Sequence, residues 1–289
     1  MRIVIFLLFL VACSHNASID ELKKMAATET YPDDNYLDTV SNKRALVVLA
    51  HDDDDCAMSG TIAKLKAAGW QIKQLSLVTH ELREGRSNHP ASIICQGNEP
   101  IVQDAFYRNG LDTMQYPYVP IPKEEMEKQF LRDKITQALV AKIKSFQPSV
   151  IFTLDNELGG YGHPEHIFIS QLIFDLFKEK AIPTQRIYQS VFTNHMEKEI
   201  VDNWLHNRMK NSGYPNATEI AKKLYNLDGM PEPTVQVNIF TQADAKMSYL
   251  LSYPETVRKN LRKFIPYFEQ FDALTYFTVF DREFFRVIE

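Results

Sequence analysis

The sequence has no excess of positively charged residues and few long apolar runs. It contains 32 Lys and Arg against 37 Asp and Glu, for a formal net charge of −5, and the basic residues form no stripe. Proteins that bind nucleic acid cluster Lys and Arg against the phosphates, so we expect no nucleic-acid partner. After the first dozen residues no stretch resembles a transmembrane helix. A hydrophobic content of 45% is ample for a large globular core.

The N-terminus reads as an export signal. Arg2 precedes a short apolar run, residues 3–11, which matches the apolar region of a secretory signal and is too short to span a bilayer. The segment Leu-Val-Ala-Cys ending at Cys13 resembles the lipobox of bacterial lipoproteins, in which the cysteine is lipidated and becomes the mature N-terminus. An ordinary signal peptide cut elsewhere is the alternative. We therefore expect removal of residues 1–12 and a lipid at Cys13.

Only three cysteines are present in the whole chain. With Cys13 lipidated, Cys56 and Cys95 remain, and an exported compartment would permit them to pair. Cys56 is expected to begin a packed helix, where a small buried apolar side chain is the commoner role. The sequence leaves their pairing open.

An apolar run that ends in a cluster of acidic side chains is the most informative stretch. Residues 45–50 are apolar without alternation, which is typical of a strand buried on both faces of a parallel sheet. A helix is expected over residues 57–68, with Gly69 as its left-handed cap. Between them stand His51 and four aspartates at 52–55, at the end of a strand where open α/β sheets bind ligands. A divalent cation would neutralise part of that charge, although Asp-rich turns also cap helices.

A second polar turn follows the expected strand over residues 149–154. It contains three glycines, which let the backbone approach a ligand closely, and Pro164 suits the first turn of a helix. His163 and His166 are three residues apart, so at a helix start both side chains project toward one face. Two histidines beside a glycine turn at the end of a second strand favour a metal site.

Two histidines, one carboxylate and an open position suit a hydrolytic zinc ion, whose bound water has a pKa of ~7. His51, Asp54 and His166 can supply this set if the two strands lie close together in the sheet. Asp53 then remains unligated near the water, and His163 remains to face the substrate.

The segments Ala-His-Asp-Asp-Asp-Asp (residues 50–55) and Gly-His-Pro-Glu-His (residues 162–166) resemble the two signatures of the PIG-L/LmbE-like zinc deacetylases. The likeness extends to residues 46–78 and, loosely, to Lys246 and the segment 283–286. The resemblance implies that the ligands are His51, Asp54 and His166. It further implies that Asp53 is the general base and that His163 stabilises the tetrahedral oxyanion.

The first signature departs from the family pattern at two positions. Asp52 replaces a proline and Asp55 replaces a glutamate, so we expect a less rigid turn and an extra carboxylate beside the metal. Either Asp52 or Asp53 could serve as the base, although the register favours Asp53. Glu165 replaces an aspartate in the second signature, which is a milder change.

The substrate stays undetermined at this level. The family's substrate-binding arginine has no counterpart at its usual spacing before Ile101, and the nearest arginines are Arg83 and Arg86. They lie in a polar loop over residues 80–100, a candidate substrate wall that could equally be a solvated surface loop. His195 is expected to be a surface or core histidine.

The remaining pattern alternates strands and helices without an internal repeat, so we predict an α/β, Rossmann-like, doubly wound, mostly parallel sheet with helices on both faces. We expect a polar tether over residues 13–42 and one LmbE-like deacetylase domain over 43–289. The further strands are expected at 71–78, 115–119, 186–193 and 234–240. The further helices are expected at 101–109, 131–146, 197–208, 217–225, 242–251 and 254–270, followed by an aromatic segment (Tyr276, Phe277, Phe280, Phe284 and Phe285) that packs over the sheet or lines a sugar site.

These expectations combine into one functional hypothesis. The chain is predicted to be a zinc-dependent N-deacetylase, a hydrolase of linear amide bonds that releases acetate from an N-acetylated sugar or glycoconjugate, with another divalent metal as an option. It is expected to be exported and held by lipid at the bacterial cell envelope, on the periplasmic side and with the outer membrane favoured. Two alternatives are a non-catalytic glycan-binding lipoprotein with a decayed metal site and a non-haem Fe(II) oxygenase, which uses the same ligand types. The oligomeric state is left open.

Overall fold

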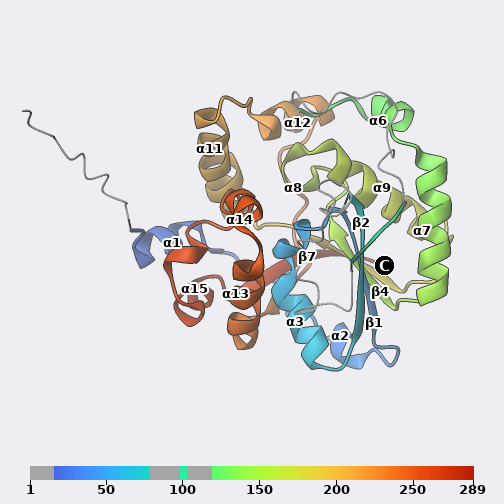
Figure 1. The fold of residues 1–289 in the computed structure, drawn as a ribbon, viewed down its shortest axis with the longest axis horizontal. Coiled ribbons are helices and arrows are strands. Elements are labelled where there is room, and N and C mark those ends of the chain that lie inside the picture. Colours follow the sequence, from blue (N-terminus) through green and yellow to red (C-terminus); the bar gives the residue numbers. More distant parts are fainter. Residues whose placement is uncertain (1–15, 79–97, 103–118) are drawn as a thin grey trace, which may run out of the picture.

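A seven-stranded sheet forms the centre of the protein, and helices cover both of its faces (Figure 1). The structure is a computed structural model that describes residues 16–78, 98–102 and 119–289. The sheet order is β3-β2-β1-β4-β5-β7-β6. The strands are β1 (Arg44–His51), β2 (Gln71–Val78), β3 (Asn98–Pro100), β4 (Val150–Leu154), β5 (Arg186–Ser190), β6 (Val235–Asn238) and β7 (Arg282–Ile288). All neighbours pair in parallel except β7, which is antiparallel to both β5 and β6.

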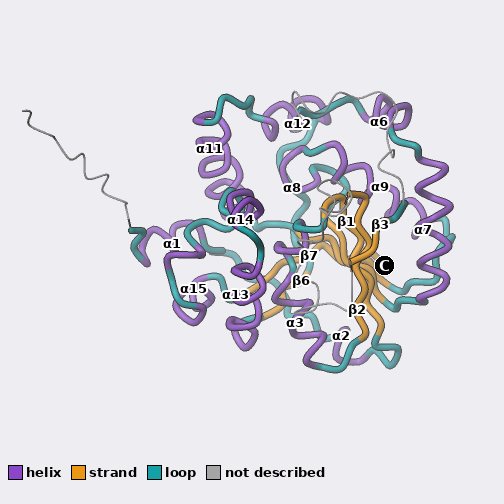
Figure 2. The backbone as a smooth tube through the Cα atoms, in the orientation of Figure 1, coloured by secondary structure: helices purple, strands orange, loops and turns teal. Residues whose placement is uncertain are grey.

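Helices surround the sheet on all sides in the tube view (Figure 2). The α-helices are α1 (Ile19–Met25), α2 (Tyr36–Thr39), α3 (Ser59–Ala67), α6 (Lys123–Gln129), α7 (Arg132–Phe146), α8 (Gly159–Gly162), α9 (Pro164–Lys178), α10 (Asn194–Met196), α11 (His206–Asn211), α12 (Ala217–Tyr225), α13 (Ala243–Ser252), α14 (Glu255–Leu261) and α15 (Ala273–Val279). The 3₁₀ turns are η1 (Asp54–Ala57), η3 (Phe240–Gln242) and η4 (Phe268–Gln270), and η2 (Glu197–Leu205) is a π-helix. The predicted doubly wound α/β fold is confirmed.

The central strand β1 packs into two separate cores. Ala45, Val47 and Leu49 point to one face, into a cluster with residues of α3, α13 and α15. The alternate residues Leu46, Val48 and Ala50 point to the other face, into a cluster with residues of α7 and α9. Because both faces of β1 are buried, its sequence is apolar without alternation. Each fully buried side chain of this kind contributes about 1.5–3 kcal/mol to the free energy of unfolding.

The strand order brings the two polar turns together. β1 pairs with β2 on one side and with β4 on the other. From β1 the chain adds β2 and β3 on one side of the sheet, and β4 and β5 then follow on the other side. The boundary between β1 and β4 is therefore the switch point of the sheet. Ligands of doubly wound folds bind in the crevice at the carboxyl ends of such strands. The turns that follow β1 and β4 therefore share the binding edge of the fold.

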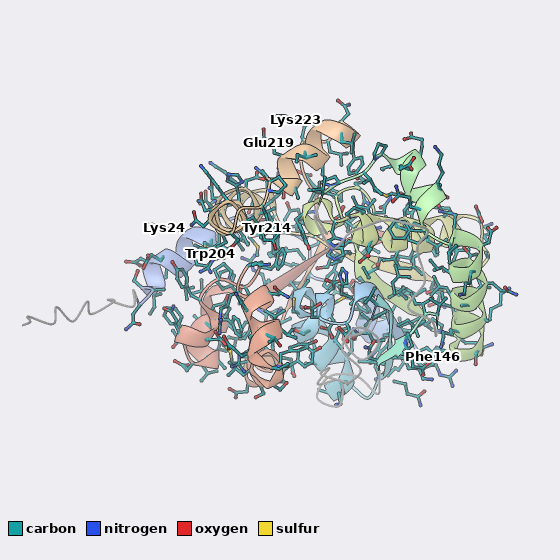
Figure 3. All side chains as sticks on the ribbon, turned by 45° about the horizontal axis from the view of Figure 1, so that its top comes forward. Lys24, Phe146, Trp204, Tyr214, Glu219 and Lys223 are labelled. Atoms are coloured by element: carbon teal, nitrogen blue, oxygen red, sulfur yellow. The ribbon has the colours of Figure 1, made fainter. Side chains whose placement is uncertain are left out.

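The N-terminal segment is more closely packed than a tether. Leu22 of α1 and Leu37 of α2 are buried in the main core, and the Asp34 amide donates to the Gln236 carbonyl beside β6. α1 also contacts the π-helix η2, and Lys24 and Trp204 lie near each other in Figure 3. The sequence assigned residues 13–42 to a polar tether because the segment is polar and Tyr31, Pro32, Asp33 and Asp34 indicate turns. From residue 19 onward the described chain instead packs on the body.

The C-terminal third contains further differences from the sequence prediction. The helix expected over residues 254–270 ends at Leu261, and Tyr267 adopts a left-handed φ of 60°. The apolar side chains of this segment consequently lie in different clusters, because Phe264 packs with Tyr161 in one cluster and Phe268 lies in the main core. The helix expected over residues 197–208 is a π-helix continued by α11. The closing aromatic segment forms α15 and the antiparallel strand β7.

Several sequence predictions fall outside the described residues. They concern Cys13 with its signal segment, the loop that carries Arg83, Arg86 and Cys95, and most of the elements expected over 101–109 and 115–119. Cys56 is buried in the main core, within the 3₁₀ turn η1. A search of the described ranges finds no helix with the length and apolar character that crossing a membrane requires.

Candidate metal centre

The first polar turn begins where β1 ends, at His51. The Asp54 side chain folds back over this turn, and its Oδ2 accepts a hydrogen bond of 2.8 Å from the His51 backbone amide. The 3₁₀ turn η1 starts at Asp54 and leads into α3. Gly69 follows α3 with φ 82°, the left-handed C-terminal position that the sequence predicted. Because the Asp54 carboxylate binds the His51 amide, the tight turn places the side chains of His51 and Asp54 together.

Hydrogen bonds within the loop hold the backbone of the second polar turn. The buried Asp155 carboxylate accepts hydrogen bonds from the backbone amides of Glu157, Leu158 and Gly160, at 2.6–3.0 Å. His163 is the N-cap of α9, with its Nδ1 accepting from the Glu165 amide, and Pro164 occupies the first helical position. His166 consequently lies in the first turn of α9, as the sequence predicted.

The three predicted metal ligands converge from the two turns. His51 Nδ1 lies 3.0 Å from His166 Nε2, and Asp54 places Oδ2 3.3 Å from His51 Nδ1 and Oδ1 3.2 Å from His166 Nε2. Donors around a tetrahedral zinc ion, each about 2.0–2.2 Å from the metal, lie roughly 3.3–3.5 Å apart. The observed separations of 3.0–3.3 Å therefore fit one small divalent ion.

Hydrogen bonds fix which nitrogen of each ring faces this centre. His166 Nδ1 lies 2.9 Å from the Gly159 carbonyl, which only accepts, so Nδ1 carries the proton and Nε2 has a free electron pair. His51 Nε2 donates to Glu165 Oε2 at 2.6 Å, which leaves the Nδ1 electron pair free in the neutral ring. Two electron pairs and a carboxylate then face one another and repel, unless a cation lies between them. A carboxylate or carbonyl that orients a ligand histidine is common in metal sites.

The electrostatics of the metal-free protein support the same conclusion. Burial lowers the pKa of His51, but Asp54 and Glu165 outweigh this effect and raise the pKa to about 10. Burial raises the pKa of Asp54, while His166 and His51 hold it well below its usual value. Without a metal, a proton on His51 supplies the positive charge that the two turns require. A bound ion would displace this proton.

The two other predicted site residues also lie at the centre. A ligand atom of Asp53 is within 4.8 Å of those of His51 and Asp54, and one of His163 is equally close to those of His51 and His166. Burial and the neighbouring His166 lower the pKa of His163 well below its usual value, so its ring is neutral. Because its Nδ1 accepts from the backbone, its Nε2 carries the proton and can donate.

The expected extra carboxylate beside the metal is not found. Asp55 is buried, and its carboxylate accepts hydrogen bonds from the hydroxyls of Tyr249 of α13 and of Tyr253, the C-cap residue of that helix. Asp52 is also buried; its Oδ2 accepts from Asn98 at 3.4 Å, and its carbonyl accepts from Tyr253 at 3.1 Å. Distant residues hold both side chains, which the sequence around positions 52–55 could not reveal.

Three charged groups outside the predicted set also lie close to the centre. Glu165, noted in the sequence only as a mild replacement, joins the two turns through its bond to His51. Lys246 of α13 forms an ion pair with Glu283 of β7, whose carboxylate accepts from the amides of Gly60 and Thr61 at 2.8 and 2.7 Å. The loose likeness noted for Lys246 and residues 283–286 thus corresponds to a contact with the start of α3.

His195 lies outside the centre. Its backbone amide donates to the Glu29 carboxylate, and its Nε2 lies 2.8 Å from the Lys24 carbonyl. Both partners belong to the N-terminal segment. The expectation of a surface or core histidine agrees with this position.

A cavity of about 150 Å³ adjoins the centre. Asp53, Asp54 and His166 line part of it, and most of the remaining lining is apolar. The apolar side chains come from η1, β4, α8, α10, η2, α14, α15, β7 and connecting segments.

Comparisons with known proteins find relatives for part of the chain. The sequence model of the PIG-L family, described as GlcNAc-PI de-N-acetylase, matches residues 46–177. Over 170 residues the chain is 25% identical to a 1D-myo-inositol 2-acetamido-2-deoxy-alpha-D-glucopyranoside deacetylase of Nakamurella multipartita, covering 50% of this chain and 58% of that protein. Over 171 residues it is 28% identical to a mycothiol S-conjugate amidase of Streptomyces coelicolor, covering 52% and 56%. The matches span little more than half the length of these relatives.

The fold is also similar to that of solved structures. A deacetylase from the biosynthesis pathway of teicoplanin, described as a complex with bog, superimposes with a TM-score of 0.50 at 12% identity. The alignment covers 85% of this chain and 98% of that one. The likeness at this level concerns the fold alone.

Proposed function

Because residues 46–177 form a PIG-L domain, we propose that this chain is a metal-dependent hydrolase that removes an N-acetyl group from an amino sugar or glycoconjugate. The observation that carries the proposal is the set of three donors, His51 Nδ1, His166 Nε2 and one oxygen pair of Asp54, which face one another at 3.0–3.3 Å. Zinc is the proposed ion because two imidazoles and one carboxylate with a further open position suit hydrolytic zinc.

Each residue of the centre has a distinct task in this proposal. His51, Asp54 and His166 hold the ion, which when bound supplies Lewis-acid chemistry that activates water and polarises a carbonyl. Asp53 accepts a proton from the attacking water and delivers it to the leaving amine. The neutral His163 donates its Nε2 proton in a hydrogen bond to the oxygen on which negative charge develops. The products are acetate and the free amine.

The sharpest test separates the base from its neighbour. Asp53→Asn should retain the metal in elemental analysis and lose about 10²–10⁴ of kcat, the usual contribution of a positioned base. Asp52→Asn is the matched control, because that carboxylate faces Asn98, and it should keep most of the turnover. Acetate release from a panel of N-acetylhexosamines, with and without a chelator, provides the assay. Substantial activity in Asp53→Asn would move the base to Asp52.

The two alternative functions give different results in the same experiments. An Fe(II) oxygenase would contain iron and would release no acetate. A glycan-binding protein without catalysis would bind N-acetylated sugars and leave them intact. The idea of a decayed site relied on Asp52 and Asp55, whose hydrogen bonds are to Asn98 and to two tyrosines of α13.

We also propose that Cys13 carries the lipid that attaches the protein to the bacterial envelope. This proposal rests on the sequence around Cys13. Wild-type protein should fractionate with membranes, outer membranes in particular, and mass spectrometry should find a lipidated N-terminal cysteine. Cys13→Ala should abolish the modification. A wild-type chain cleaved elsewhere and recovered without lipid would contradict the proposal.

A further inference from the structure

The cavity beside the candidate centre has an apolar wall that begins next to a metal ligand. The Tyr161 ring lies 5.3 Å from the His166 ring and 4.9 Å from the Phe264 ring, measured between centroids. Beyond this contact the lining continues with buried or half-buried apolar side chains, namely Val191, Phe192, Met196, Ile200, Met230 and Phe284. A group bound at the centre therefore has a hydrocarbon surface within reach.

The charged side chains that line the same cavity already have partners. Lys246 and Glu283 pair with each other, and Glu283 also accepts two backbone amides of α3. Arg282 binds the Asp281 carboxylate, the Glu29 carbonyl and the Gln236 side chain, at 3.0–3.1 Å. A ligand in this part of the cavity would consequently gain more from apolar contact than from new ion pairs.

The two sides of an N-acyl amino sugar differ in what they need from a protein. The sugar side presents hydroxyls, each of which costs free energy if it is buried without a hydrogen bond. The acyl side is hydrocarbon and gains about 0.8 kcal/mol for each buried methylene. Apolar cavities of about 150 Å³ stay dry and bind hydrocarbons as large as benzene, and this one has that volume. The lining fits the acyl side.

We propose that this cavity binds the acyl chain of the substrate, so that the enzyme prefers an N-acyl group longer than acetyl. This inference rests on the proposed function. The acid released from the preferred substrate would then be a short fatty acid in place of acetate. The reaction is otherwise unchanged. Water adds its oxygen to the acyl carbon, the C–N bond breaks, and the proton taken by Asp53 goes to the amine.

The test is a series of glucosamines carrying N-acetyl, N-butanoyl, N-hexanoyl and N-octanoyl groups. The value of kcat/KM should rise roughly threefold to fourfold with each added methylene until the cavity is filled, because each methylene is withdrawn from water. Hexyl N-acetylglucosaminide places the same hydrocarbon on the other side of the amide and should give no comparable gain. A gain confined to the hexyl glycoside would overturn the assignment to the acyl chain.

A binding measurement separates this inference from the proposed function. The Asp53→Asn protein should bind N-hexanoylglucosamine at least tenfold more tightly than N-acetylglucosamine in calorimetric titrations. Hydrolysis of N-acetylglucosamine without any dependence on chain length would overturn the acyl cavity and leave the deacetylase. Length-dependent binding with no hydrolysis by wild-type protein would support the cavity and overturn the enzyme.

Two matched substitutions locate the effect. Ile200→Phe enlarges a side chain in the cavity lining and should reduce the ratio of N-hexanoyl to N-acetyl turnover by tenfold or more. Met209→Phe enlarges a buried side chain that belongs to the same cluster as the lining residues Tyr161 and Met230 but does not itself line the cavity. It should leave the ratio at the wild-type value while causing a similar loss of stability. Equal changes in the two variants would count against the cavity.

Discussion

The two turns that carry the candidate ligands reach the same edge of the sheet, but different parts of the chain hold them. The backbone of the second turn, after β4, is fixed by Asp155, which accepts three amides of its own loop, and by glycines with positive φ, while Arg286 of β7 binds the side chains of Asn156 and Glu157. The first turn, after β1, has no glycine between His51 and Asp55. Tyr249 and Tyr253 of α13 hold it through Asp52 and Asp55, nearly 200 positions later in the sequence.

The residues that hold the two turns lie in different parts of the chain. The residues that fix the backbone of the second turn lie within the segment 46–177 that matches the PIG-L family, whereas α13 and Arg286 lie outside it. The aspartates that replace the family's proline and glutamate are the two residues that the tyrosines bind. A turn that lacks a rigid proline is thus stabilised by buried hydrogen bonds from the C-terminal half. The candidate centre therefore depends on both halves of the chain.

The largest expected effect comes from the backbone of the second turn. Gly159 has φ 58°, and an added Cβ would lie 2.8 Å from His166 Cβ and 2.9 Å from the Ile167 amide nitrogen. Gly159→Ala should lower the free energy of unfolding by about 3 kcal/mol or more and weaken metal binding at least ~100-fold, because strain and the clash move His166. Thermal unfolding and competition with a zinc chelator measure the two effects.

Gly160→Ala is the control for that substitution. Gly160 also has a positive φ, 80°, but an added Cβ would meet no atom within 4 Å. The variant should lose about 1 kcal/mol from backbone strain and keep near-normal metal affinity. If both variants lose the metal equally, the contact with His166 is not the cause.

A smaller effect is expected from the tyrosines that hold the first turn. Tyr253→Phe removes the hydrogen bonds to the Asp52 carbonyl and the Asp55 carboxylate, and Tyr249→Phe removes the shorter one to Asp55. Each change should weaken metal binding roughly tenfold, the range seen when groups that orient ligands are removed. Tyr276→Phe is the control, since it loses a buried bond to the Pro266 carbonyl in the main core. An equal loss of affinity in Tyr276→Phe would mean that α13 has no specific role.

The smallest expected effect is the release of a proton from His51 of the first turn when the metal binds. In the metal-free protein the pKa of His51 is raised to about 10, and its protonated form contributes stability that is complete below about pH 6.5 and lost as the pH rises through about 10. Metal binding at pH 7–9 should release about one proton, and the affinity should rise about tenfold per pH unit. Calorimetry in two buffers of different ionisation heat counts the proton.

His163 of the second turn should release no proton when the metal binds, because its lowered pKa keeps the ring neutral at the same pH. His163→Gln should therefore release the same number of protons as wild-type protein. His51→Gln should bind metal too weakly to compare. Binding to the wild-type protein without proton release at pH 8 would contradict the charge assigned to His51.

The sequence alone determined the local chemistry of the site. The apolar run 45–50 predicted β1, Pro164 predicted the start of α9, and the spacing of His163 and His166 placed both in or beside its first turn. These features are readable because each depends on residues close together in the chain. The signatures then gave the family of residues 46–177, and the alternation of strands and helices gave the fold class.

Only the tertiary structure decided how these pieces meet. The order of the sheet puts β4 next to β1, and that pairing depends on packing across about 100 residues. Tyr249 and Tyr253 bind the Asp55 carboxylate, and Asn98 binds the Asp52 carboxylate, so distant residues hold both side chains. Side chains from segments far apart in the sequence, among them Leu154, Tyr161, Phe192 and Phe284, form the apolar cavity. No pattern in the sequence encodes these contacts, because they arise only when distant segments bury their surfaces against one another.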